Sequence, residues 1–90
     1  MIENAHWSDL KSKRLKRIRG VSFKEIIKGK IIDEILNPTR ENQRIFIIEY
    51  KQYVWAIPFV IQEDGSIFLK TIYPSRKLTR RYKGDLYEKD

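Results

Sequence analysis

The chain has 90 residues, a formal net charge of +7 and no cysteine. This length accommodates one domain with one core, and we expect residues 1–90 to form it. The lack of cysteine excludes disulfides, thiolate nucleophiles and cysteine-ligated metals, and it is typical of a reducing compartment. No signal-peptide pattern opens the sequence, and no apolar run approaches the ~20 residues of a membrane span. We therefore expect a cytoplasmic protein with no membrane partner.

Positive charge is concentrated in two segments. Residues 10–30 hold nine basic side chains and one acidic side chain, and residues 70–83 hold six basic side chains and no acidic one. Residues 31–69, between them, hold three basic and six acidic side chains. Such clustering is typical of a surface for a polyanion, because each neutralised phosphate releases counterions. A positive surface is also common in small proteins with no such partner.

A first helix is expected over residues 9–18. Ser8 is a candidate N-cap, and Gly20 is a candidate left-handed residue that ends the helix. Helical spacing puts the apolar side chains on one inward side and the basic side chains on the rest. The residues expected on the inward side are Trp7, Leu10, Leu15 and Ile18.

A second, short helix is indicated by a capping box. Ser22 and Glu25 have the spacing at which each side chain bonds the other residue's backbone N–H. Val21 and Ile26 flank them at the positions of a hydrophobic staple. Gly29 is expected to end this helix.

Four segments rich in β-branched and aromatic residues predict strands: residues 31–36, 44–50, 53–61 and 67–73. Lys51-Gln52 is the expected hairpin turn. The third segment is apolar at both alternating sets of positions, which predicts a central strand covered on both faces. Pro58 cannot donate to a ladder, so we expect a bulge or a switch to an unpaired edge there.

The order of these elements predicts an α+β fold. Two N-terminal helices would pack on a four-strand antiparallel meander, followed by a short basic C-terminal tail or helix from Pro74 onward.

The residue types present favour phosphodiester chemistry without a metal. The only histidine is His6 and the acidic residues are scattered, so we expect no metal site and no cofactor. Glycine-rich phosphate loops and nucleophile elbows are absent from the sequence. RNA carries its own nucleophile, the 2′-OH, so a protein need only align it, move protons and stabilise charge on phosphorus.

Candidates for this chemistry lie on the predicted strands or directly after them. Arg44 begins one strand, Glu49 lies further along it, Lys70 lies on the last strand, and Arg76 and Lys77 follow that strand. Each has an ordinary structural alternative, such as a strand charge that discourages edge pairing or, for Glu49, a surface ion pair with a lysine. The basic residues after Lys77 could equally form a solvated tail.

Two stretches of the sequence resemble BrnT-type toxins. Trp7 and a basic segment lead into Arg-Gly-Val-Ser-Phe-Lys-Glu-Ile at residues 19–26, which is similar to the family's opening motif. Residues 73–79, Tyr-Pro-Ser-Arg-Lys-Leu-Thr, resemble its closing motif. Arg44 matches an arginine that the family tends to hold before an apolar strand. The likeness covers residues 7–83 in the same order and spacing.

The resemblance implies a RelE-like fold and a metal-independent ribonuclease that inhibits translation, the toxin of a bacterial toxin–antitoxin pair. It also implies a co-encoded antitoxin, commonly with a ribbon–helix–helix part, through which alone the toxin reaches operator DNA. Carried over to this sequence, it makes Arg44, Arg76 and Lys77 catalytic candidates beside Glu49. The expected RNA-binding residues are Arg19, Lys70, Ser75, Thr79, Arg80 and Arg81.

The sequence departs from the family pattern in three ways. Arg19 stands where a histidine is usual, Leu78 replaces a small residue, and Arg81-Tyr82 replaces a frequent acidic residue. An arginine does not deprotonate at neutral pH, so Arg19 could only stabilise charge. Two other functions therefore stay open. One is a non-enzymatic RNA- or DNA-binding module that uses its basic helix and exposed aromatic residues; the other is a degenerate toxin that acts as corepressor with its antitoxin. The aromatic candidates are Tyr53, Tyr73 and Tyr82.

Overall fold

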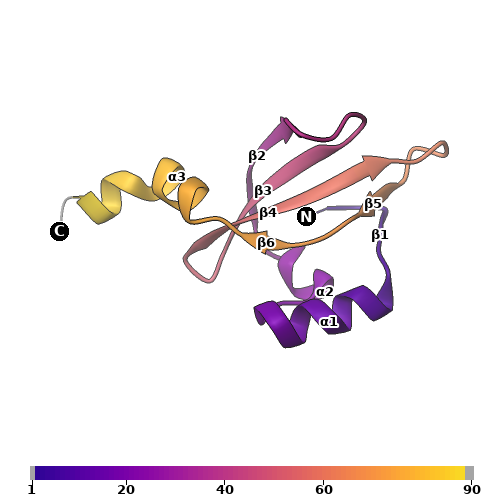
Figure 1. The fold of residues 1–90 in the computed structure, drawn as a ribbon, viewed down its shortest axis with the longest axis horizontal. Coiled ribbons are helices and arrows are strands. Elements are labelled where there is room, and N and C mark those ends of the chain that lie inside the picture. Colours follow the sequence, from indigo (N-terminus) through magenta and orange to yellow (C-terminus); the bar gives the residue numbers. More distant parts are fainter. Residues whose placement is uncertain (1, 89–90) are drawn as a thin grey trace.

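One mixed sheet forms the centre of the structure, a computed structural model that describes residues 2–88 (Figure 1). Its strands lie in the order β1-β5-β4-β3-β2, and β6 also pairs with β4. All neighbours are antiparallel except β1 and β5. In chain order the elements are β1 (Ala5–His6), α1 (Asp9–Arg19), α2 (Phe23–Ile26), β2 (Lys30–Leu36), β3 (Arg44–Tyr50), β4 (Tyr53–Ile61), β5 (Ile67–Leu69), β6 (Tyr73–Pro74) and α3 (Arg76–Glu88).

The predicted α+β class is confirmed, but the sheet is not a pure meander. Strands β2 to β5 are consecutive antiparallel neighbours, as expected. The predicted last strand over residues 67–73 is split into β5 and β6, and β1 adds a parallel partner at one edge. The basic segment after Pro74 forms the helix α3 and not a tail.

Pro58 marks the point where β4 changes its outer partner. The ladder with β3 runs without a break through the pair Ile45 and Pro58, so the expected bulge is absent on that side. The Pro58 carbonyl accepts a hydrogen bond from the Lys70 N–H (2.8 Å). The Pro58 nitrogen therefore faces the same outer side, where it has no proton to donate. Because the ladder cannot continue there, β5 ends and β6 begins further along.

The β3–β4 hairpin has the predicted two-residue turn. Lys51 and Gln52 have positive φ angles of 52° and 64° and join the paired residues Tyr50 and Tyr53. Two such residues in succession give a type I′ turn, whose twist matches that of the flanking strands. Side chains at left-handed positions cost energy that glycine avoids. The pairing of β3 with β4 therefore stabilises the turn.

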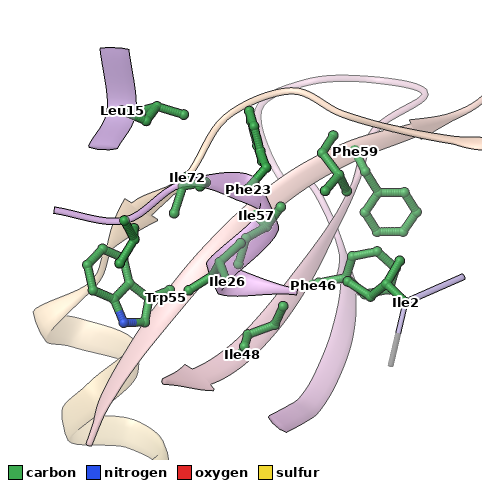
Figure 2. Close-up of a cluster of buried hydrophobic side chains, with 12 residues drawn as sticks. Ile2, Leu15, Phe23, Ile26, Phe46, Ile48, Trp55, Ile57, Phe59 and Ile72 are labelled. Atoms are coloured by element: carbon green, nitrogen blue, oxygen red, sulfur yellow. The ribbon is translucent and has the colours of Figure 1, made fainter. Parts of the chain in front are cut away.

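The larger hydrophobic core lies between the sheet and the two N-terminal helices (Figure 2). The rings of Phe46 and Phe59 stack across β3 and β4 with centroids 4.0 Å apart. Trp7 packs against this core and stacks on Phe23, with centroids 5.9 Å apart. Other buried members include Leu15, Ile26, Ile48, Trp55, Ile57 and Ile72.

The inward face of α1 differs from the predicted one. Leu15 is buried, but Leu10 and Ile18 are 80% and 61% exposed. Ser12 is buried in their place, and its Oγ accepts a hydrogen bond from the Phe23 N–H (3.0 Å). This bond joins α1 to the start of α2, and on this face Ser12 and Leu15 point inward whereas Leu10 and Ile18 point outward.

The two N-terminal helices, α1 and α2, are capped at their starts as predicted. The Ser8 side chain accepts a backbone N–H of α1, and Gly20 ends that helix with a φ of 82°. Ser22 and Glu25 make both bonds of the capping box. A hydrogen bond from Lys16, with the bond from the Ser22 N–H, lowers the pKa of Glu25 to about 2.

The opposite face of the sheet carries a smaller cluster beneath α3. Leu78 and Tyr82 of α3 pack against it, and its four buried members are Ile45, Ile47, Val54 and Ala56. Strand β4 is thus covered on both faces, which confirms the prediction from its continuous apolar run.

Gly29 makes a contact that a side chain would prevent. A Cβ there would lie 2.6 Å from Ile48 Cγ2 and 2.7 Å from the Glu49 carbonyl oxygen. We expect Gly29→Ala to lower the free energy of unfolding by about 1–3 kcal/mol, because the chain must move away from β3. Gly84→Ala is the matched control. A Cβ on this helical glycine meets nothing closer than 3.9 Å, so it should stabilise by up to about 1 kcal/mol. Urea unfolding measures the free energy of unfolding of both variants. Changes of the same sign in the two variants would contradict the packing argument.

Candidate nucleic-acid interface

Two hydroxyl groups attach α3 to β4. The Ser75 N–H donates to the Val54 carbonyl, and the Ser75 Oγ accepts the Leu78 N–H as an N-cap, both at 3.0 Å. The Thr79 Oγ1 accepts from the Val54 N–H (3.0 Å) and donates to the Ser75 carbonyl (2.7 Å). Both candidate RNA-binding hydroxyls therefore position α3. Thr79 is 5% exposed and has almost no surface left for an RNA.

Four basic side chains on the first two turns of α3 are exposed: Arg76, Lys77, Arg80 and Arg81. Arg81 lies over the ring of Tyr82, with 5.9 Å to the centroid. The other three make no hydrogen bond or ion pair with the side chains that the structure describes. Positive charge at the N-terminal end of a helix opposes the helix dipole. These basic residues therefore do not stabilise the start of α3, and helix stability does not explain their presence there. They are called the α3 cationic face below.

Glu49 lies beneath α3 and pairs with Lys83. The hydrogen bond from Lys83, together with the charges of Lys83 and Lys30, holds the pKa of Glu49 below its ordinary value. Glu49 is thus a carboxylate at neutral pH and a weak base, whereas a general base works best with a pKa near the working pH. The surface ion pair that the sequence left open as an alternative is present, and it anchors α3 to β3.

Tyr82 forms a second anchor on the same side of α3. Its hydroxyl donates to Asp33 Oδ2 on β2 (2.7 Å). This bond lowers the pKa of Asp33 and raises the pKa of Tyr82, so Tyr82 stays protonated at neutral pH. The three tyrosines expected to be exposed, Tyr53, Tyr73 and Tyr82, are half-buried.

Arg44 lies far from the α3 cationic face. Its Nε donates to Glu34 Oε2 on β2 (2.5 Å). Along β3 it shares the side of Phe46, which faces the core beneath the N-terminal helices. Glu49 is five residues further along, about 16 Å away on the strand. Because α3 begins near the Glu49 end of the sheet, the structure separates Arg44 from Arg76.

Arg19 is exposed at the end of α1, which lies below the sheet in Figure 1, whereas α3 extends away from the sheet on the left. Lys70 follows β5, is exposed, and lies over the Phe68 ring with 5.6 Å to the centroid. The candidate residues therefore do not form one cluster. Of the predicted set, the structure brings together Arg76, Lys77, Arg80 and Arg81 on α3, with Glu49 beneath the helix.

Lys70 also lines a pocket of about 320 Å³ that sequence reasoning missed. Lys11 from α1 and Arg40 from the β2–β3 loop reach the same pocket, and no acidic side chain of the described residues lines it. Nothing local in the sequence could have shown this convergence, because the three cations come from segments far apart in the chain. The polar and aromatic walls include Asn37, Gln43, Thr71 and Tyr73.

Comparison of the chain with models of known protein families, with curated proteins and with solved structures gave no significant match. The likeness to BrnT-type toxins therefore rests on the residues quoted above. Within the described part of the chain, no three histidine or carboxylate side chains gather into a group that could hold a metal. No helix among the described residues has the length and apolar character needed to cross a membrane.

Thr79→Val tests whether the hydroxyl bonds hold α3. Valine keeps the shape of the side chain but leaves the buried Val54 N–H without an acceptor. We expect a loss of about 1–3 kcal/mol in the free energy of unfolding. Thr71→Val is the control, since Thr71 makes no side-chain hydrogen bond to a described residue; it should change stability by less than about 0.5 kcal/mol. A Thr79→Val protein as stable as the parent in urea would show that α3 does not depend on this bond.

Proposed function

We propose that this chain binds RNA through the α3 cationic face and acts as the ribonuclease toxin of a bacterial toxin–antitoxin pair. The observation that supports the proposal is the α3 cationic face itself, with its exposed basic side chains and no acidic residue in the first turn. Bonds between such groups and phosphate oxygens are among the stronger hydrogen bonds of proteins. The net charge of +7 would draw RNA to the molecule from a distance.

Arg76 has the central role in the proposed cleavage. In this reaction the 2′-oxygen of RNA attacks phosphorus, and the bond to the 5′-oxygen breaks. The 2′-OH loses a proton, and the leaving 5′-oxygen gains one. A guanidinium group can bind two phosphate oxygens at once and stabilise the charge that grows on them in the transition state. Lys77 would add a second positive charge beside it.

The proposed partners other than RNA come from the sequence likeness. A co-encoded antitoxin, commonly with a ribbon–helix–helix part, would neutralise the toxin. Operator DNA would be reached only through this antitoxin. The proposal includes no metal or other cofactor.

RNA or DNA binding without cleavage is the second candidate. Two observations favour it: Arg44 lies far from Arg76, and Glu49 is held in an ion pair as a weak base. A degenerate toxin that acts only as corepressor would share these features.

Arg76→Ala tests the proposed role of α3. Arg76 is exposed and unpaired among the described side chains, so the melting temperature should stay the same. RNA cleavage should fall about a hundredfold or more, because a transition-state contact is lost. Arg14→Ala is the matched control, which removes the same charge from the exposed side of α1 and should retain cleavage. RNA cleavage in EDTA and growth after induction are the two measurements.

The outcomes separate the candidates. Growth arrest and EDTA-resistant cleavage by the parent, both lost in Arg76→Ala, would support the toxin. RNA binding without cleavage or arrest would leave the binding module. Equal losses of RNA cleavage in Arg76→Ala and Arg14→Ala would remove Arg76 from the site. A lower melting temperature of Arg76→Ala with full cleavage activity per folded molecule would do the same.

A further inference from the structure

We infer that the pocket lined by Lys11, Arg40 and Lys70 binds a single phosphate-bearing nucleotide. The inference goes beyond the proposed function, because none of these three cations lies on α3 and the site does not require that α3 bind RNA. It starts from charge. Three basic residues from separate elements line one pocket of about 320 Å³, and none of the acidic residues that the structure describes lines it.

The charge of this pocket is not balanced by the protein. Lys11, Arg40 and Lys70 make no ion pair with the described residues. Like charges that line a common pocket repel one another and disfavour the folded state. A bound phosphate would replace this repulsion by attraction, because each cation would then face a negatively charged oxygen. The pocket therefore has the electrostatics of an anion site.

The wall that carries Arg40 is ordered by Asn37. The Asn37 N–H donates to the Gln43 carbonyl (3.0 Å), and its Nδ2 donates to Gln43 Oε1 (3.2 Å). Its Oδ1 accepts from the N–H and the hydroxyl of Thr39, at 3.0 and 3.1 Å. Such Asx bonds hold a loop in one conformation. The loop is thus arranged before any ligand arrives, which lowers the entropic cost of binding.

The opposite wall is fixed by the break in the outer ladder of β4. The Lys70 N–H bonds to the Pro58 carbonyl (2.8 Å), and Tyr73 pairs with Ala56 in β6. Residues 70–72 leave the ladder between these two points. Pro58 itself lines the pocket, so the residue that interrupts the sheet also helps to form the site.

The size and lining of the pocket suit one nucleotide. Small-molecule sites usually measure about 300–1,000 Å³, and this pocket lies at the lower end of that range. The cations supply phosphate contacts, and the Tyr73 ring supplies an aromatic surface. The side-chain N–H groups of Asn37 and Gln43 that the loop's own bonds do not use can donate to a sugar or base. A free nucleotide and one residue of an RNA strand present the same phosphate, ribose and base.

Titration with adenosine monophosphate tests the inference. Amide chemical shifts of the full chain would be followed at constant ionic strength, with inorganic phosphate as a second probe. We expect saturable shifts at residues 37–43 and 70–73. Arg40→Ala and Lys70→Ala should each weaken the affinity about tenfold, since each removes one charge-assisted contact. Lys24→Ala, an exposed cation on α2 outside the pocket, should leave it unchanged.

The outcomes show whether the pocket binds a nucleotide and whether that nucleotide is free or part of an RNA strand. Failure of both probes to shift these amides, or equal weakening by Lys24→Ala, would overturn the inference. If a short RNA displaces the nucleotide, the pocket holds one residue of an RNA strand; if it does not, the pocket holds a free nucleotide. Arg76→Ala should leave nucleotide binding intact, so failure of the proposed RNA contact on α3 would be seen separately.

Discussion

The missing N–H of Pro58 shapes most of the functional surface. Strand β4 keeps a continuous ladder with β3 but cannot keep one outer partner, so β5 stops and β6 starts further along. The gap between them becomes one wall of the cationic pocket. The chain then returns to β4 at β6, where the Ser75 N–H bonds to Val54 and α3 begins. One proline in a central strand thus helps to position both candidate binding surfaces.

The two sides of α3 have different roles. Its inner side uses apolar packing, the Thr79 hydroxyl, the Lys83–Glu49 pair and the Tyr82–Asp33 bond to fix the helix on the sheet. Its outer side presents Arg76 and the basic residues that follow. Because the inner bonds hold the helix without these cations, their charge is available to an anionic partner. This division supports binding more directly than catalysis, because the carboxylate beneath the helix, Glu49, is held in an ion pair with Lys83 that keeps its pKa below the ordinary value.

Short sequence motifs and the spacing of apolar residues predicted the parts of the fold that depend on local sequence. The capping box at Ser22, the stop at Gly20 and the two-sided burial of β4 follow from short patterns and are present. The predicted inward face of α1 was partly wrong: Leu15 is buried as expected, but Leu10 and Ile18 are exposed, and Ser12 is buried with its hydroxyl bonded to the Phe23 N–H. The anchoring of Thr79 and the convergence that forms the pocket could not be predicted, since they join residues far apart in the chain.

The most direct measurement of the central claim is a chemical-shift map of the full chain with a short single-stranded RNA. If α3 is the RNA-binding element, the largest shifts should fall on the amides of residues 76–81, and they should diminish as salt is raised, because counterion release drives the contact. Shifts confined to residues 9–19 of α1, or no saturable shift at low salt, would contradict the assignment of RNA binding to α3.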